Sequence, residues 1–364
     1  MLETYKRKGG IKMIDIIVGG LYGDESKGQV AAWLTELRRK QTELQSYYFG
    51  IRVGGSNAEH RFHLPNGKKY TSRVMPTAAW VDPNIISVLG AGHVIKLDTL
   101  LKEIEELKEL HGECKLLIDP QAGVIQENHV QQGKETNWRG STHQGTGQAV
   151  VHKVKRDGTF NLAASYPELQ PHIFHHGLPS LMNVWLQSGR RGLIEGSQGV
   201  LLSLNHGYYP YCTSKDTTPA ALLAEAGVAT CWLDKIYTIY RTVPMRVPGN
   251  SGPTGGAELT WEKLEDSISV EIPEQMKVQT DSGDRERVFL WSWEDFEKSM
   301  VLCNPDYIIL TFLDWYPQSL MGMDIDAFRR RIENLTKKPI ILLRYGPKWE
   351  DYIYDLHKHR NGVK

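Results

Sequence analysis

Short apolar runs recur along the chain, and many segments between them repeat apolar positions every three or four residues. One such stripe contains Leu97, Leu100, Leu101, Ile104 and Leu107, which is the spacing of an amphipathic helix over residues 97–110. Short runs that are apolar throughout are typical of strands buried on both faces. The pattern therefore predicts strands at 14–18, 85–89, 116–118, 192–195, 235–241, 307–311 and 340–343, and further helices at 30–39, 218–226 and 327–335.

This alternation of strands and helices predicts an α/β fold with a mostly parallel central sheet flanked by helices. In such a sheet, ligands bind beyond the carboxyl ends of the strands. No repeat, low-complexity tract or clear linker divides the chain, so we expect residues 13–364 to form a single domain. Residues 1–12 are polar and lack the apolar segment of a signal peptide, so we expect a flexible N-terminal extension.

The composition excludes several classes of partner. The 43 Lys and Arg residues balance the 43 Asp and Glu residues, so no basic surface for nucleic acid or a membrane is indicated. No apolar run reaches the roughly 18 residues of a membrane span. The four cysteines are far apart and form no Cys-x-x-Cys pair, which is typical of a reduced protein. We therefore expect a cytoplasmic protein that binds neither nucleic acid nor membranes.

A glycine-rich loop follows the first predicted strand, and residues 19–29 read Gly-Gly-Leu-Tyr-Gly-Asp-Glu-Ser-Lys-Gly-Gln. Such a loop before a helix points backbone N–H groups at an anion, and Lys27 can reach a phosphate. It is not a Walker A sequence. Asp24 and Glu25 would repel a phosphate unless a metal or a proton transfer requires them. The loop therefore indicates a phosphate site with a catalytic acid or base; the alternative is a tight turn whose glycines only permit packing.

Three further polar segments carry candidate groups. His60 ends the sequence Gly-Gly-Ser-Asn-Ala-Glu-His, where it suits acid chemistry near neutral pH; the alternative is an ordinary surface histidine. Residues 140–147 combine glycines with hydroxyl groups that suit a phosphate, and a basic stretch follows; the alternative is a solvated polar loop. Residues 195–218 are rich in glycine and hydroxyl side chains, and the amide of Gln198 can read the edge of a base.

Two segments lie in the C-terminal third of the chain. Arg285 and Arg287 belong to a glycine loop and can clamp a carboxylate; the alternative is a salt-bridged surface turn. Residues 310–314, Leu-Thr-Phe-Leu-Asp, resemble the guanine-reading motif of GTP-binding proteins, but Phe312 replaces the lysine of that motif. Tyr-Gly-Pro at 345–347 follows the last predicted strand.

These segments, in this order, resemble adenylosuccinate synthetases. The resemblance runs from about Asp15 to Tyr352. It rests on Gly-Asp-Glu-x-Lys-Gly at 23–28, Asn-Ala-x-His at 57–60, Glu-Gly-x-Gln-Gly at 195–199 and Tyr-Pro-Tyr-x-Thr-Ser at 209–214. It implies a fold related to that of P-loop proteins and a ligase that joins L-aspartate to the 6-position of a purine monophosphate, using a nucleoside triphosphate and Mg²⁺. The compact length and Thr-Ser-Lys-Asp at 213–216 resemble the short archaeal branch and related phage enzymes.

The resemblance also implies a role for individual residues. Asp24 matches the aspartate that removes the N1 proton of the purine and binds Mg²⁺, together with Glu59 as a second metal position. His60 matches the acid at O6, and Lys27 stabilises the transferring phosphoryl group. Contacts to the purine monophosphate are implied for Asn57, Ser141, Thr142, Arg156, Gln198, Thr213 and Val247. Contacts to the triphosphate are implied for Gly23, Glu25, Ser26, Lys27, Gly28, Gln29, Thr311, Asp314, Gly346 and Pro347. Contacts to aspartate are implied for Thr280, Ser282, Gly283, Arg285 and Arg287. Family dimers donate the arginine matched by Arg156 to the neighbour's site, so a homodimer is expected.

Four departures from the family pattern refine this hypothesis. Ser26 replaces a usual glycine, and Glu59 replaces the glycine whose carbonyl group helps to hold Mg²⁺. Asp284 stands where the family has an arginine that serves the ribose 2′-hydroxyl, which suggests a 2′-deoxy substrate. Phe312 cannot act as the guanine-motif lysine, which favours ATP or dATP over GTP. Together these departures resemble the phage enzymes that convert dGMP to a 2-aminoadenylosuccinate deoxynucleotide.

Two alternatives to a ligase acting on dGMP stay open at this point. The first is an ordinary adenylosuccinate synthetase that uses IMP and GTP. The second is an inactive nucleotide-binding regulator, which the presence of Asp24, Lys27, His60 and Gln198 disfavours. A GTPase switch is a weaker rival, because the Walker A sequence is absent and Phe312 replaces the lysine.

Overall fold

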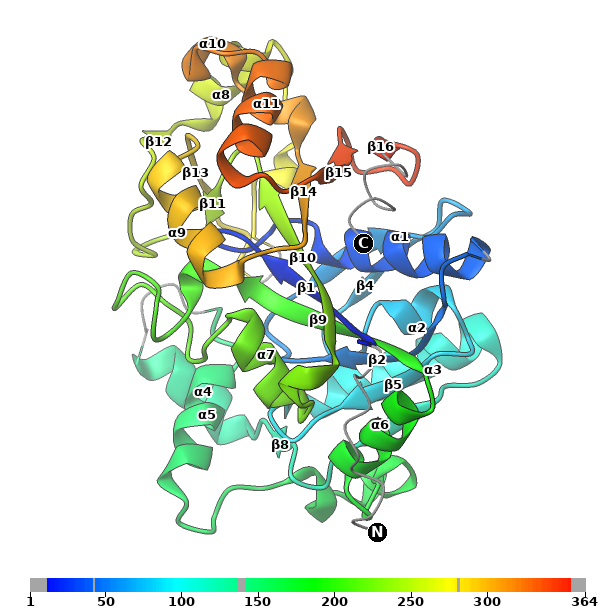
Figure 1. Ribbon diagram of the computed structural model, residues 1–364. Helices are drawn as coiled ribbons and strands as arrows, with labels where there is room; N and C mark the ends of the chain where they lie inside the picture. Colours follow the sequence, from blue (N-terminus) through cyan, green and yellow to red (C-terminus); the bar gives the residue numbers. More distant parts are fainter. Residues whose placement is uncertain (1–11, 42, 137–141, 280–281, 355–364) are drawn as a thin grey trace.

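A nine-stranded sheet forms the centre of the computed structural model, which describes residues 12–354 apart from 42, 137–141 and 280–281 (Figure 1). The strand order is β16-β15-β14-β10-β1-β9-β2-β5-β7, and all neighbours are parallel except β15 and β16. The strands are β1 (Ile14–Gly19), β2 (Tyr47–Arg52), β5 (Ile86–Leu89), β7 (Leu116–Ile118), β9 (Arg191–Gly199), β10 (Leu233–Arg241), β14 (Tyr307–Thr311), β15 (Ile340–Arg344) and β16 (Tyr352–Tyr354). The predicted α/β class with a mostly parallel sheet is confirmed.

Helices and short strands complete the fold. The α-helices are α1 (Lys27–Lys40), α2 (Ala78–Val81), α3 (Leu97–His111), α4 (Glu127–Thr136), α5 (Thr146–Lys155), α6 (Leu178–Gln187), α7 (Pro219–Ala226), α8 (Trp261–Ile268), α9 (Trp293–Cys303), α10 (Gln318–Met321) and α11 (Ile325–Thr336). The 3₁₀ helices are Ala163–Ser165, Pro167–His172, Val200–Leu202, Thr230–Trp232, Glu274–Met276 and Leu313–Trp315. Small sheets are made by β3 (His60–His63) with β4 (Lys69–Ser72), by β6 (Val94–Ile95) with β8 (Gly123–Val124), and by β11 (Met245–Arg246), β12 (Glu258–Leu259) and β13 (Arg287–Phe289).

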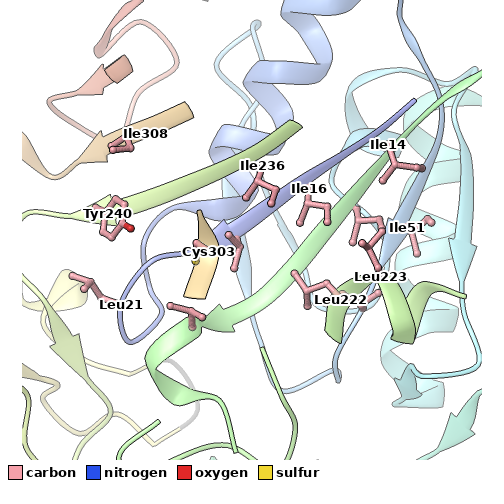
Figure 2. Packing of buried hydrophobic residues seen from close by; sticks show 14 of the residues in the cluster. Ile14, Ile16, Leu21, Ile51, Leu222, Leu223, Ile236, Tyr240, Cys303 and Ile308 are labelled. Atoms are coloured by element: carbon pink, nitrogen blue, oxygen red, sulfur yellow. The ribbon is translucent and has the colours of Figure 1, made fainter. Parts of the chain in front are cut away.

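Both faces of the central sheet are covered, which explains why its strands show no polar alternation. Successive residues of a strand face opposite sides of the sheet. Ile16 packs with residues of α6, α7, α9 and α11, as Figure 2 shows for Leu222 and Leu223 of α7. Ile17 packs instead with residues of α1 and with Tyr237 and Tyr307. Burying each such aliphatic side chain contributes about 1.5–3 kcal/mol to stability.

Helix α7 illustrates how local sequence sets an element. Thr218 caps it by accepting a hydrogen bond from the N–H of Ala221, and Pro219 occupies the first turn, where no N–H is needed. Gly227 ends it in the left-handed conformation that glycine tolerates. None of the helices in the described part of the chain is both long and apolar enough to span a membrane.

The seven predicted strands all occur in the central sheet, with ends that differ by a few residues. Helix α1 begins at Lys27, three residues earlier than predicted, so Lys27 belongs to the helix and not to the loop. The prediction missed β2, which lies between β9 and β5. Gly50 and Arg52 interrupt its apolar pattern, and Arg52 is fully buried because Glu195 of β9 neutralises it. Residues 1–11 of the expected extension lie outside the described residues.

Candidate active site

A cavity of about 1360 Å³ lies where the carboxyl ends of β1, β9, β10 and β14 meet loops and helix α5. Most of the site residues expected from the sequence line this cavity: Gly23, Asp24, Glu25, Ser26, Lys27, Gly28, Gln29, Asn57, Glu59, His60, Thr142, Gln198, Thr213, Val247, Asp314, Gly346 and Pro347. Ser141 and Thr280 lie outside the described residues. The topology therefore brings together segments that are up to about 320 residues apart in the chain.

The glycine-rich loop between β1 and α1 forms one wall of the cavity. Gly23, Asp24 and Ser26 all have positive φ angles, so the chain turns tightly before the helix begins. Ser26 makes no side-chain capping bond to α1, and the first turn of that helix carries no acidic residue. This leaves the first turn without a side-chain acceptor, which suits an incoming anion. The opposite loop packs closely, since a Cβ atom on Gly199 would lie 2.3 Å from the carbonyl oxygen of Leu21.

Glu25 serves the loop itself. Its carboxylate accepts the N–H of Leu21 at 2.6 Å and pairs with the ammonium group of Lys27 at 3.0 Å, and both side chains are buried. The pair gives a reason for the acidic residue in this loop, since Glu25 neutralises the buried charge of Lys27. The fold therefore gives Glu25 a structural partner in addition to its place in the cavity wall.

Asp24 reaches into the cavity from the same loop. Its side chain is 59% exposed, and its carboxylate pairs with the guanidinium group of Arg241, the last residue of β10. Arg241 also donates to the backbone carbonyl of Asp24 at 2.9 Å and lies 3.6 Å from the ring centre of Phe312. Arg241 therefore joins the loop of Asp24 to the loop after β14. Sequence reasoning did not find Arg241, because nothing near it in the chain indicates its partners.

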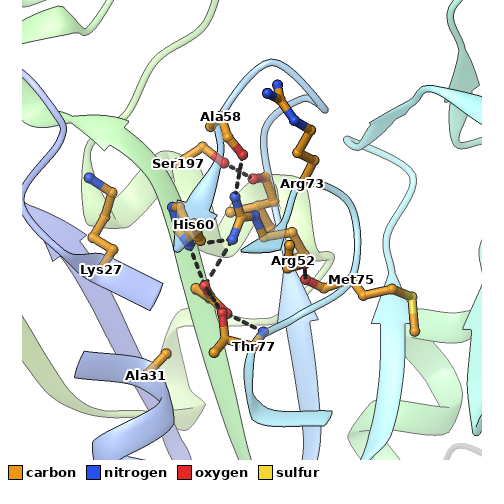
Figure 3. A network of polar contacts seen from close by, with 12 residues as sticks. Lys27, Ala31, Arg52, Ala58, His60, Arg73, Met75, Thr77 and Ser197 are labelled. Carbon is orange, nitrogen blue, oxygen red and sulfur yellow. Dashed lines mark hydrogen bonds and ion pairs between the residues drawn. The ribbon is translucent and has the colours of Figure 1, made fainter. Parts of the chain in front are cut away.

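His60 lies at the start of β3, and Figure 3 shows the polar network behind it. Its Nδ1 contacts both the carboxylate of Glu195 and the guanidinium group of Arg52. Glu195 is held further by the backbone N–H and the hydroxyl group of Thr77, each at 2.7 Å. The Nε2 atom of His60 is buried and has no hydrogen-bond partner among the described residues.

This network corrects the expected ionisation of His60. Burial and the charge of Arg52 lower the pKa of His60 to about 3, while Glu195 opposes them. The imidazole is therefore neutral at physiological pH, and the expected role of His60 at O6 stays a prediction. A neutral histidine can still donate a hydrogen bond. When Nδ1 accepts from Arg52, the ring proton is on Nε2; when Nδ1 donates to Glu195, Nε2 is an acceptor.

A second part of the cavity lies at the ends of β14 and β15. Phe312, Asp314, Trp315, Gly346 and Pro347 line it. Asp314 is exposed at the cavity surface, and partial desolvation by the surrounding wall raises its pKa to about 6, while the charge of Arg241 opposes this effect. Thr311 does not line the cavity, because its hydroxyl group turns inward, 3.3 Å from the carbonyl oxygen of Glu25. The side chain of Thr311 is therefore not placed to make the expected contact with a triphosphate in the cavity.

The loop before helix α5 brings Thr142 and Gln144 to the cavity, and the first turn of α5 brings Thr146. Arg156 follows the helix as an exposed residue with a positive φ angle and does not line the cavity of its own chain. Glu59, the second expected metal position, is engaged by arginines, since its two carboxylate oxygens contact Arg61 and Arg73.

The loop before β13 is arranged differently from the expectation. Arg285 pairs with Glu274 at 2.7 Å on the surface, and Arg287 pairs with Glu258 at 2.6 Å beside a separate cavity of about 540 Å³. Ser282 and Gly283 are exposed and lie outside the main cavity. Gln279 and Glu286 of this loop line the main cavity, and Glu286 lies between the two arginines. In this structure both arginines therefore form ion pairs with glutamates, as in the alternative of a salt-bridged surface turn.

Asp295 of α9 is a second residue that sequence reasoning missed. Its carboxylate accepts hydrogen bonds from the hydroxyl groups of Tyr22 at 2.8 Å and Tyr208 at 2.7 Å, and from the N–H of Gly255 at 2.8 Å. These three donors come from three loops around the cavity. No local motif marks Asp295, because its partners lie 40 to 273 residues away.

Comparisons with known proteins agree with this geometry. The family model described as adenylosuccinate synthetase matches residues 16–163 and 160–271. The adenylosuccinate synthetase of Methanococcus aeolicus is 34% identical over 352 residues, which cover 93% of this chain and 98% of that protein. The N6-succino-2-amino-2′-deoxyadenylate synthase of Vibrio phage phiVC8 is also 34% identical, over 317 residues that cover 84% of this chain and 87% of that protein.

Solved structures share the fold. The succinoaminodeoxyadenylate synthetase of cyanophage S-2L, bound to dGMP and to dATP as an energy donor, superposes with a TM-score of 0.80 at 23% identity, covering 97% of this chain and 99% of that chain. The fully ligated adenylosuccinate synthetase of Plasmodium falciparum gives a TM-score of 0.77 at 20% identity, covering 95% and 100%. Because the family model and the sequence relatives span most of the chain, it belongs to the adenylosuccinate synthetase family of carbon–nitrogen ligases.

Proposed function

We propose that this protein joins L-aspartate to the 6-position of dGMP, with ATP or dATP as the phosphoryl donor. The observation that carries the choice of sugar is the arrangement of residues 282–287. Arg285 and Arg287 are paired with glutamates outside the main cavity, and Asp284 is exposed. No arginine of this loop is therefore placed to bind a ribose 2′-hydroxyl, so a deoxy sugar loses no contact here. The phage relative and the cyanophage structure, whose names specify deoxynucleotides, support the same choice.

In the proposed reaction, Asp24 takes the N1 proton of the purine and O6 attacks the terminal phosphorus of the triphosphate. The product is a 6-phosphoryl purine. The neutral amino group of aspartate then attacks C6 and gives up one proton to solvent, and the C–O bond breaks to release phosphate. His60 donates a hydrogen bond from Nε2 to O6 in the tautomer whose Nδ1 accepts from Arg52, and so stabilises the charge on O6 without being an imidazolium. Lys27 and the first turn of α1 hold the transferring phosphoryl group.

The donor set at Asp24 fits Mg²⁺. Magnesium is usually held by one or two carboxylates together with substrate phosphates and water, and the partly exposed carboxylate of Asp24 faces the cavity. Glu59 is a weaker metal ligand in this arrangement, since arginines hold both of its oxygens. Magnesium bound at Asp24 would neutralise charge on the triphosphate.

The choice of triphosphate is proposed from Phe312 and Asp314. A phenylalanine ring stacks on any purine, and the carboxylate of Asp314 can accept from the amino group of adenine. We expect kcat/KM for ATP or dATP to exceed that for GTP, as steady-state kinetics with each triphosphate would measure. A tenfold preference for GTP would overturn this part of the proposal.

Competition between acceptors tests the proposal directly. Equimolar dGMP, GMP and IMP are offered to limiting enzyme with aspartate and ATP, and the succinylated products are counted by mass spectrometry. We expect the dGMP product to dominate, because a buried polar group left unpaired costs about 1–3 kcal/mol. A dominant product from IMP would favour the ordinary synthetase, which the archaeal relative supports. No product from any acceptor would favour the inactive regulator.

A further inference from the structure

One carboxylate of the main cavity has no role in the reaction described so far. Glu286 lies between Arg285 and Arg287, whose side chains turn away to pair with Glu274 and Glu258. Its backbone is held on both sides. The N–H of Glu286 donates to the carbonyl of Lys277 at 2.7 Å, and its carbonyl accepts from the indole Nε1 of Trp261 at 2.8 Å. The direction of the Glu286 side chain into the cavity is therefore fixed by the fold.

The charges around Glu286 leave its carboxylate without a partner. Asp24, Arg241 and Arg61 are its electrostatic neighbours, and burial together with Asp24 raises the pKa of Glu286 to about 8 against the two arginines. Arg241 is already held by Asp24. Within the described part of the chain, no hydrogen bond or ion pair engages the Glu286 carboxylate. Glu286 is half-buried, and a cationic donor from a ligand would favour the ionised form of its carboxyl group.

We propose that Glu286 binds the amino group of the amino-acid substrate, and this inference rests on the function proposed above. In that reaction Asp24 acts at N1, which is bonded to C6, so the attacking amine must come close to Asp24. Glu286 is an electrostatic neighbour of Asp24 in the same cavity. An amino acid enters as an ammonium ion at neutral pH, and a carboxylate accepts its N–H groups in charge-assisted hydrogen bonds. Glu286 is then a substrate-binding residue that recognises the ammonium form of the amino acid, which loses a proton before its nitrogen attacks C6.

The test compares a charged with an uncharged nucleophile in Glu286→Gln. Aspartate carries an ammonium group, whereas hydroxylamine is a neutral amine at pH 7.5. We expect kcat/KM for aspartate to fall about 10- to 100-fold, the scale of a hydrogen bond to a charged group, mostly through a higher KM. With hydroxylamine as the nucleophile, we expect the rate of Glu286→Gln to match that of the wild type. Glu262→Gln is the matched control, because Glu262 pairs with Arg285 on the surface nearby and should leave both rates unchanged.

Three outcomes would overturn the inference. Unchanged aspartate kinetics in Glu286→Gln would refute it, and so would an equal loss with both nucleophiles, which is the mark of a structural defect. Restoration of activity by added Mg²⁺ would make Glu286 a metal ligand instead. If Glu286→Gln does not fold, Glu286→Asp keeps the charge and should retain the preference for aspartate. Should the wild type form no succinylated product, the proposed function fails, and titration calorimetry of aspartate against wild type and Glu286→Gln still tests Glu286.

Discussion

At the scale of single residues, the site works by pairing charges that would be costly alone. Arg52 and Glu195 are fully buried and neutralise each other behind His60, and Arg241 is held by Asp24. A buried charge without a partner would cost several kcal/mol, so these pairs fix which groups face the ligand. In this arrangement the imidazole of His60 stays neutral, and the carboxylate of Asp24 stays at the cavity surface.

The two reacting side chains should be essential in different ways. Asp24→Asn removes the proposed base, and His60→Asn removes the hydrogen bond to O6. We expect each change to lower kcat roughly 100-fold or more, the scale of general acid–base catalysis. Steady-state rates measure the effect, and thermal unfolding shows that the fold is kept. Asp266→Asn, a change of an exposed aspartate on α8, is the control; near-normal turnover of either site variant would refute its assignment.

The raised pKa of Asp314 predicts that binding of the triphosphate depends on pH. Its pKa in the folded protein is about 6, so the carboxylate is ionised above that pH and neutral below it. An ionised group accepts hydrogen bonds at both oxygens, whereas a protonated one loses acceptor capacity. We expect the KM for ATP to rise as the pH falls from 7 to 5. Asp314→Asn should have a high KM with no change across this range, and a flat KM in the wild type would contradict the prediction.

At the scale of elements, a residue of helix α9 forms hydrogen bonds to loops around the cavity, although α9 itself does not line the cavity. Asp295 sits in the first turn of α9, where Ser292 caps the helix, and it receives donors from three cavity loops. One buried carboxylate therefore holds the side chains of Tyr22 and Tyr208 and the backbone N–H of Gly255. We therefore expect a residue outside the cavity lining to influence the shape of the site.

Loss of the Asp295 carboxylate should loosen all three loops. Asp295→Asn keeps the size of the side chain but has one oxygen acceptor fewer, so at least one buried donor is left unpaired. We expect a loss of about 1–3 kcal/mol in the free energy of unfolding, together with a higher KM for the purine monophosphate. Urea denaturation and initial rates measure the two effects. Glu294→Gln, at the exposed neighbouring position of α9, should change neither the stability nor the KM. If Asp295→Asn also leaves both unchanged, Asp295 does not hold the three loops.

At the scale of the whole molecule, we propose a homodimer in which Arg156 enters the partner's site. Arg156 is exposed at the end of α5 and does not line the cavity of its own chain, whereas Val151 and Val154 of the same helix are exposed at its rim. An inactive Arg156→Leu protein mixed with an inactive Asp24→Asn protein should regain about a quarter of the wild-type activity, because one of the two sites in a mixed dimer is then intact and half of the dimers are mixed. Sedimentation of a fully active monomer would contradict the dimer.

The sequence by itself determined the class of fold, the positions of most strands along the chain, the glycine-rich loop after the first strand and the family. These features depend on local periodicity and on short motifs, which are readable within about ten residues. The same local patterns placed Asp24, Gln198 and Thr213 at the ends of strands or in the loops that follow them, where a parallel sheet collects its ligands.

Only the tertiary structure decided the charge state of His60, the inward turn of Thr311 and the choice of Glu286 over Arg285 and Arg287 as the residue that lines the cavity. Each depends on partners far away in the chain, as in the contact between Arg52 and Glu195, 143 residues apart. Strand β2 was missed for the same reason, since its buried arginine is stable only beside that glutamate. The physical cause is that burial and pairing, which set ionisation and direction, are properties of neighbours in space and not of neighbours in sequence.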